Sequence, residues 1–185
     1  MPAPTFHLNG DVLGFGRKGL HALRHVIARL QLTESAMSLQ EAGYTAGEDL
    51  YAAFRRWLPA YAGIQDPAEI DSARLGEVLS EFFKTLGWGA VTMEQLGAAG
   101  LVLDSLDWAE AEPGANAERP CCYLSAGMLA RFLGTMAGSD VAVMEVECRS
   151  CNDARCRFLA GSTEMLQAVY ESIAAGKDYR QALLE

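Results

Sequence analysis

The chain has 185 residues, half of them hydrophobic and 21% charged, and its formal net charge is −9. A chain of this length can bury a sizeable core as one domain without disulfides. The acidic balance argues against a nucleic-acid-binding surface and disfavours adsorption to anionic membranes.

The N-terminus has no basic segment followed by an apolar run, so a secretory signal is not expected. No stretch of 18 apolar residues predicts a membrane span. We therefore expect a cytoplasmic protein, in which the five cysteines stay reduced. Clustered cysteines in that compartment are more often metal ligands than disulfides.

Helices are predicted in the first half of the chain. Apolar residues recur at helical spacing over residues 18–32, 36–57 and 72–86. Gly43 and Gly47 weaken the second stretch, which could therefore form two pieces, and Pro59 and Gly63 are expected to end it.

The second half mixes strands and helices. We expect strands over 88–96 and 101–108, a polar loop over 109–120, a helix over 125–137, strands over 141–148 and 156–160, and a helix over 163–174. This order predicts one α+β domain over residues 1–185, with a helical part at 1–86 and an antiparallel sheet packed with helices at 87–185.

A cysteine-rich segment, EVECRSCNDARC, runs from Glu145 to Cys156, and Cys121 and Cys122 lie upstream. Thiolates on both sides of a turn commonly hold zinc, which accepts sulfur and carboxylate ligands in a tetrahedral shell. Two ligand sets compete, and they share three cysteines but differ in the fourth ligand: Cys122, Cys148 and Cys156 with either Cys151 or Glu145.

Spacing alone favours Cys151, because Cys148-x-x-Cys151 is a common zinc loop. In a flat strand, residues 145 and 148 point to opposite faces, so a site with Glu145 requires a bend near Glu147. A third interpretation is a group of small buried thiols without any metal.

The stretch EVECRSCNDARCRFLAGS resembles the C-terminal signature of the 4-vinyl reductase domain family. This family includes bacteriochlorophyll-synthesis accessory proteins, predicted hydrocarbon-binding proteins and the sensor domains of phenol- and toluene-responsive activators. The resemblance implies a fold similar to TRAPP-complex subunits. It also implies a closed, structural Zn²⁺ site, because the phenol-sensor relatives use an upstream Cys, a Glu-x-x-Cys and a Cys eight positions later. The matching residues here are Cys122, Glu145, Cys148 and Cys156, which leaves Cys151 outside the shell.

The resemblance further implies a cavity for a small hydrophobic molecule between helices and sheet. Large apolar residues available to line it are Phe82, Trp88, Trp108, Phe132 and Val143, although for each one alone an ordinary core position is the more common role. The phenol sensors hold the phenol hydroxyl with a His and a Trp. This chain has no His after His25, which favours a more apolar ligand.

No dinucleotide motif, P-loop or nucleophile elbow is present, so the sequence gives no catalytic residues. The first hypothesis is a zinc-stapled sensor or carrier of a hydrophobic molecule, acting as a homodimer and, if it senses, through a separate output protein. The alternatives are an accessory protein or reductase of (bacterio)chlorophyll and tetrapyrrole synthesis, and a dimeric protein-interaction scaffold.

Overall fold

The computed structural model describes residues 13–30, 34–96 and 100–182. Its elements follow the chain in this order: α1 (Arg17–Arg29), α2 (Ser35–Ala62), η1 (Pro67–Glu69), α3 (Ser72–Thr85), β1 (Thr92–Leu96), β2 (Gly100–Ser105), α4 (Tyr123–Ala137), β3 (Ala142–Glu147), η2 (Arg149–Cys151), β4 (Cys156–Gly161), α5 (Thr163–Ala174) and α6 (Tyr179–Ala182). None of the described helices is long and apolar enough to cross a membrane.

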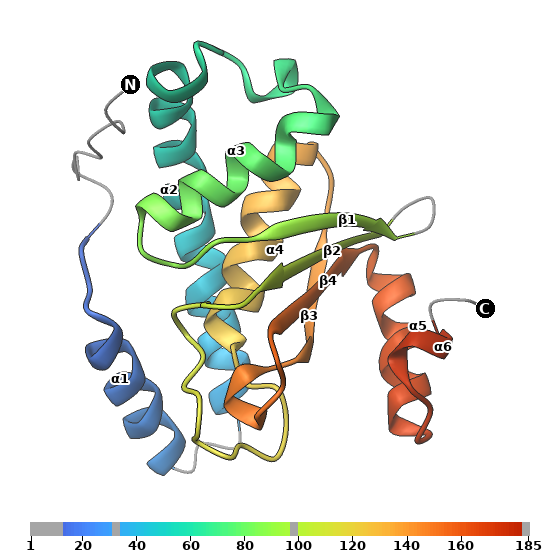
Figure 1. The fold of residues 1–185 in the computed structure, drawn as a ribbon. Coiled ribbons are helices and arrows are strands. Elements are labelled where there is room, and N and C mark those ends of the chain that lie inside the picture. The colour runs from blue at the N-terminus through green and yellow to red at the C-terminus, as the bar shows by residue number, and fades with distance from the viewer. Residues whose placement is uncertain (1–12, 31–33, 97–99, 183–185) are drawn as a thin grey trace.

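The four strands form one antiparallel sheet in the order β1-β2-β4-β3. Helices α2, α3 and α4 cover one face, and α5 covers the other (Figure 1). Alternation along β4 explains the two layers, because successive side chains point to opposite faces. Phe158 and Ala160 enter the main core with α2–α4, whereas Leu159 packs with Leu166 and Val169 of α5. The expected α+β fold with an antiparallel sheet is confirmed.

Helix α2 is a single continuous helix and does not split at its glycines. A Cβ on Gly43 would lie 1.9 Å from the carbonyl oxygen of Leu124 on α4, and one on Gly127 would lie 1.9 Å from that of Gln40 on α2. The glycines therefore allow the backbones of α2 and α4 to touch. The expectation that they interrupt the helix was wrong, because close helix packing outweighs their low helix propensity.

Pro59 also lies inside α2, which ends at Gly63 in a left-handed conformation with φ of 72°. The expected stop at Pro59 is therefore corrected, whereas Gly63 ends the helix as predicted. Trp57 and Leu58 are buried next to Pro59, and this packing holds the last turn despite the missing N–H.

Strand β3 is irregular opposite β4. Glu145 pairs with Phe158 and Glu147 pairs with Arg157, so one extra residue, Val146, is accommodated between them. Such a bulge bends the strand and changes which side chains face the core. The bend that a site with Glu145 requires near Glu147 is therefore present.

The strands around the two tryptophans are shorter than expected. Trp88 and Trp108 both lie outside β1 and β2, although the Ala109 N–H donates to the Trp88 carbonyl at 2.7 Å. Gly87 and Gly89 have φ of 81° and 122°, which interrupts extended backbone before β1. The two indoles, 5.6 Å apart between ring centroids, connect the sheet edge to the aromatic core.

Candidate metal centre and apolar grooves

Four side chains converge where α4, β3 and β4 meet. Cys122 precedes α4, Glu145 lies on β3, Cys148 follows that strand, and Cys156 begins β4. One ligand atom from each lies within 4.8 Å of all the others, and the three cysteines are fully buried. Three cysteines and a glutamate in this arrangement could hold a metal ion.

The spacing of the sulfur atoms fits a tetrahedral ion. The Sγ atoms of Cys122 and Cys148 are 3.7 Å apart. Two thiolates bound to zinc at about 2.3 Å in tetrahedral geometry would be separated by about 3.8 Å. The pair is therefore already placed at the edge length that such a shell requires.

Glu145 completes the cluster with one carboxylate oxygen that forms no hydrogen bond to the part of the chain that the structure describes. Its Oε2 accepts the backbone N–H of Cys122 at 2.8 Å. Its Oε1 is buried and, among the described residues, accepts no hydrogen bond. A buried, unpaired carboxylate oxygen is costly unless a cation or another donor satisfies it.

The charges of the cluster also call for a cation. Burial, together with the charge of Cys148, raises the pKa of Glu145 to about 8. Hydrogen bonds from the thiols of Cys121, Cys122 and Cys156 lower the pKa of Cys148. Several acidic groups thus lie in one buried space, where the charge of each ionised group disfavours ionisation of the others. A bound cation would allow Cys122, Glu145, Cys148 and Cys156 to ionise together.

The two remaining cysteines lie beside this group. Cys151 is on η2, half-buried, and burial followed by the Cys148 charge raises its pKa to about 12, so it is a neutral thiol. The Cys121 sulfur accepts a hydrogen bond from Arg24 at 3.0 Å. Neither belongs to the group of four whose ligand atoms converge.

A buried polar network next to the cluster was not anticipated from the sequence. Glu110 is fully buried and accepts the N–H of Leu124 at 3.2 Å and both the N–H and hydroxyl of Ser125, at 2.7 and 2.5 Å. The Trp108 indole N–H donates to the Ser125 hydroxyl at 2.7 Å. Burial raises the pKa of Glu110, although Ser125 and the charge of Arg24 act in the opposite direction. An acidic residue in the polar stretch 109–120 gave no signal that it would be buried.

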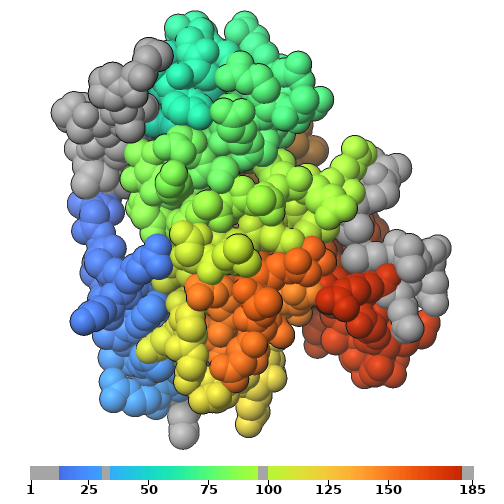
Figure 2. Space-filling model, viewed as in Figure 1, coloured from blue at the N-terminus to red at the C-terminus, as the bar shows by residue number. Residues whose placement is uncertain are grey.

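Helix α1 packs against this region through its polar face. Arg24 donates to the carbonyl oxygens of Glu110 and Cys121 at 2.5 and 2.9 Å. His21 contacts the Ala109 carbonyl at 3.0 Å, and His25 contacts Glu112 at 2.7 Å. Figure 2 shows α1, in blue, lying against the yellow segment that leads into α4.

The five residues predicted to line one ligand cavity do not line a single cavity in the structure. Phe82, Trp108 and Phe132 are fully buried in the aromatic core, where Phe82 and Phe132 stack at 6.0 Å. Trp88 lines a groove of about 390 Å³ between the start of α1 and the end of α3, together with Leu20 and Leu50. The ordinary-core interpretation therefore fits three of the five, and Trp88 faces an open apolar space.

Val143 lines a second, smaller groove of about 290 Å³. This groove lies beside β3, and its lining also includes Tyr123, Leu166 and Tyr170 together with Glu145 and Cys122. It is therefore close to the candidate metal ligands, whereas the groove at Trp88 is formed by other elements.

Residues 109–162 match the family model of the 4-vinyl reductase domain, and this segment contains all four candidate ligands. The resemblance to the 4-vinyl reductase domain family is thereby confirmed. No curated protein sequence matches the chain.

Several solved structures share the fold. The phenol-responsive sensory domain of the transcription activator PoxR with phenol is 15% identical, with a TM-score of 0.61, over 83% of this chain and 77% of that one. A vinyl-4-reductase family protein from Methanocaldococcus jannaschii is 22% identical, with a TM-score of 0.50, over 75% and 76%. Trafficking protein particle complex subunit 3 from Naegleria fowleri, covalently bound to palmitic acid, is 14% identical, with a TM-score of 0.54, over 78% and 95%. The expected TRAPP-like fold is confirmed.

Proposed function

We propose that this chain, with its 4-vinyl reductase segment at residues 109–162, is a cytoplasmic single-domain sensor or carrier of a small hydrophobic molecule, stapled by one zinc ion. The observation that carries the binding role is the apolar groove at Trp88. Its volume of about 390 Å³ falls within the usual range of ligand sites, and four helices contribute to its wall. The phenol bound by the PoxR sensory domain, which has the same fold, supports a small-molecule ligand.

Zinc is the ion that best suits the four-residue cluster. Three soft thiolates outnumber the one hard carboxylate, and a set dominated by sulfur favours zinc over the oxygen-preferring magnesium or calcium. Four protein ligands leave no open coordination position, so the ion would be structural. Cys122, Glu145, Cys148 and Cys156 would tie the start of α4 to the adjacent ends of β3 and β4.

The binding role can be tested with purified protein and a panel of neutral apolar probes such as naphthalene and decanol. We expect at least one probe to raise the melting temperature, because a ligand that binds only the folded state stabilises it. Trp88→Ala should abolish the shift. Tyr170→Ala, which changes the groove at Val143, should leave it intact. If no probe raises the melting temperature, the proposal is contradicted. If the rise is lost only in Tyr170→Ala, the ligand binds in the smaller groove at Val143 instead.

A second candidate, a homodimeric interaction scaffold, is favoured by the outer face of α1. Leu23, Val26 and Leu30 form an apolar stripe along this helix and are 48%, 43% and 63% exposed. A surface helix normally buries its apolar face, but α1 buries Leu20 and packs through Arg24 and His21, and leaves this stripe uncovered. A stripe along one helix is self-complementary about a two-fold axis, so a second copy of the chain could cover it.

A further inference from the structure

The groove at Trp88 contains one charged side chain, Arg17, among otherwise apolar and small residues with a single threonine, Thr85, as far as the described residues go. Leu20, Leu50 and Trp88 form part of the apolar wall. A pocket of this composition binds the body of a ligand through apolar contact and sets its orientation through the few polar groups present.

Arg17 is held at the groove but not neutralised. Its Nη2 donates to the carbonyl oxygen of Gly87 at 3.1 Å, which anchors the guanidinium beside the end of α3. Within the described part of the chain, Arg17 forms no ion pair. Arg24, Arg131 and Arg157 each face a carboxylate.

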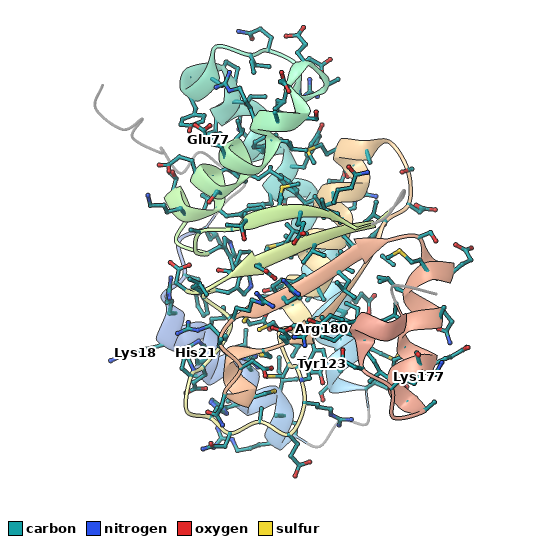
Figure 3. All side chains as sticks on the ribbon, turned by 45° about the vertical axis from the view of Figure 1, so that its right-hand side comes forward. Lys18, His21, Glu77, Tyr123, Lys177 and Arg180 are labelled. Carbon is teal, nitrogen blue, oxygen red and sulfur yellow. The ribbon has the colours of Figure 1, made fainter. Side chains whose placement is uncertain are left out.

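The first turn of α1 and the described lining of the groove place no acidic side chain beside Arg17. The first turn of α1 contains no acidic residue, and Gly16 gives no side-chain cap. Lys18 follows in the same turn and projects outward into solvent (Figure 3). Among residues 13–30, 34–96 and 100–182, no acidic side chain lines the groove. An anionic group at Arg17 would therefore meet no like charge from this part of the groove wall.

We propose that the ligand of this groove is an amphiphilic anion, with its apolar body against Trp88, Leu20 and Leu50 and its acidic group at the Arg17 guanidinium. This inference rests on the proposed function of the groove and adds the chemical class of its ligand. Arg17 has further N–H donors beyond the one used by Gly87, and a guanidinium can bind a carboxylate through two parallel hydrogen bonds.

The test compares decanoate with decanol, which share the chain but differ in charge, by titration calorimetry at neutral pH. Wild type should bind decanoate at least about tenfold more tightly than decanol, as a charge-assisted hydrogen bond predicts. Arg17→Gln should remove about that factor for decanoate and leave decanol unchanged. Arg17→Lys should restore part of it. Arg29→Gln is the matched control, because Arg29 lies on the same helix but does not line this groove.

The results separate this inference from the proposed function. Equal binding of decanoate and decanol, unaffected by Arg17→Gln, would overturn the anionic ligand and leave an apolar site in place. An absence of decanoate binding, while neutral probes still raise the melting temperature, would do the same. An equal loss for Arg17→Gln and Arg29→Gln would reduce the effect to general charge and would also overturn it.

Discussion

The carboxylate of Glu145 accepts the backbone N–H of Cys122 at 2.8 Å, across 23 positions of sequence. This hydrogen bond fixes the start of α4 to β3 through the protein alone. The second oxygen of the same carboxylate is buried without a partner among the described residues. Glu145 therefore both positions one cysteine of the cluster and offers a free oxygen to an ion beside it.

Substitution at residue 145 should separate the two candidate ligand sets. In Glu145→Gln an amide oxygen can still accept from Cys122, but it is a weaker, neutral metal ligand. We expect zinc affinity to fall at least about tenfold, measured by competition with a chelator. Cys151→Ser should keep one zinc per chain in native mass spectrometry. The opposite pair of results would show a four-cysteine site.

The packing of α2 against α4 should depend strongly on the absence of a side chain at Gly43. In Gly43→Ala the new methyl would collide with the Leu124 carbonyl, so α2 and α4 must separate. We expect a loss of about 3 kcal/mol or more in the free energy of unfolding, measured by urea denaturation.

Gly76→Ala is the matched control in α3, where the nearest atom to a Cβ lies at 3.5 Å. Its better helix propensity should raise stability by about 0.5–1 kcal/mol. A loss of similar size in both variants would show that the α2–α4 contact is looser than described.

The ion network of Glu147 should make part of the stability depend on pH. Partial burial disfavours its ionised form, but hydrogen bonds from Tyr179, Arg155 and Arg180 outweigh this and lower its pKa to about 2. Arg180 reaches this carboxylate from α6, and Figure 3 labels its position. Because the folded pKa is below the unfolded value, the contribution is present above about pH 4.5 and is lost as pH falls toward 2.

We expect the free energy of unfolding of wild type to exceed that of Glu147→Gln by about 1–2 kcal/mol at pH 6, allowing for solvent screening. This difference should shrink below pH 4.5. Any loss of a bound metal on acidification would affect wild type and Glu147→Gln alike, so the difference between their free energies of unfolding isolates Glu147. A difference that stays constant down to pH 3 would show that ionisation of Glu147 is not its source.

Charges on the outer stripe of α1 should dissociate the proposed homodimer. Leu23→Glu with Val26→Glu places two carboxylates on a surface that would be buried between copies. Light scattering after gel filtration should then give a monomer, whereas Ile173→Glu, at an exposed position of α5, should keep the dimer. A wild-type protein that is already monomeric would rule out the scaffold.

Local sequence patterns were sufficient for most of the fold, whereas for the candidate metal cluster they left the fourth ligand open between Cys151 and Glu145. Helical spacing and the N-cap at Asp71 place α3 within one residue of its predicted end. The family resemblance selected Glu145 as the fourth ligand. The alternation of side chains along a strand predicted a bend near Glu147, and the structure has a bulge at Val146. These features depend on neighbours in sequence, which is why the sequence contains them.

The remaining features depend on contacts between distant segments. Gly43 resembles a helix breaker until α4 is placed against it. Glu110 resembles a solvent-exposed loop residue until Ser125 supplies its donors. No sequence pattern marked Arg17 as a residue of a binding groove. Its surroundings become apolar only because α1 lies next to Trp88 and the end of α3 in the folded chain.

The extra residue at Val146 also constrains how relatives of this chain can be identified. With the bulge, Glu145 and Cys148 reach one common point, while Glu147 turns toward α6. Deleting a single residue between Glu145 and Cys148 would restore simple alternation, and the two side chains, then two positions apart, would still share one face of the strand. A homologue with Glu-x-Cys on a regular strand should therefore be able to bring these two side chains together, as Glu-x-x-Cys does on the bulged strand here.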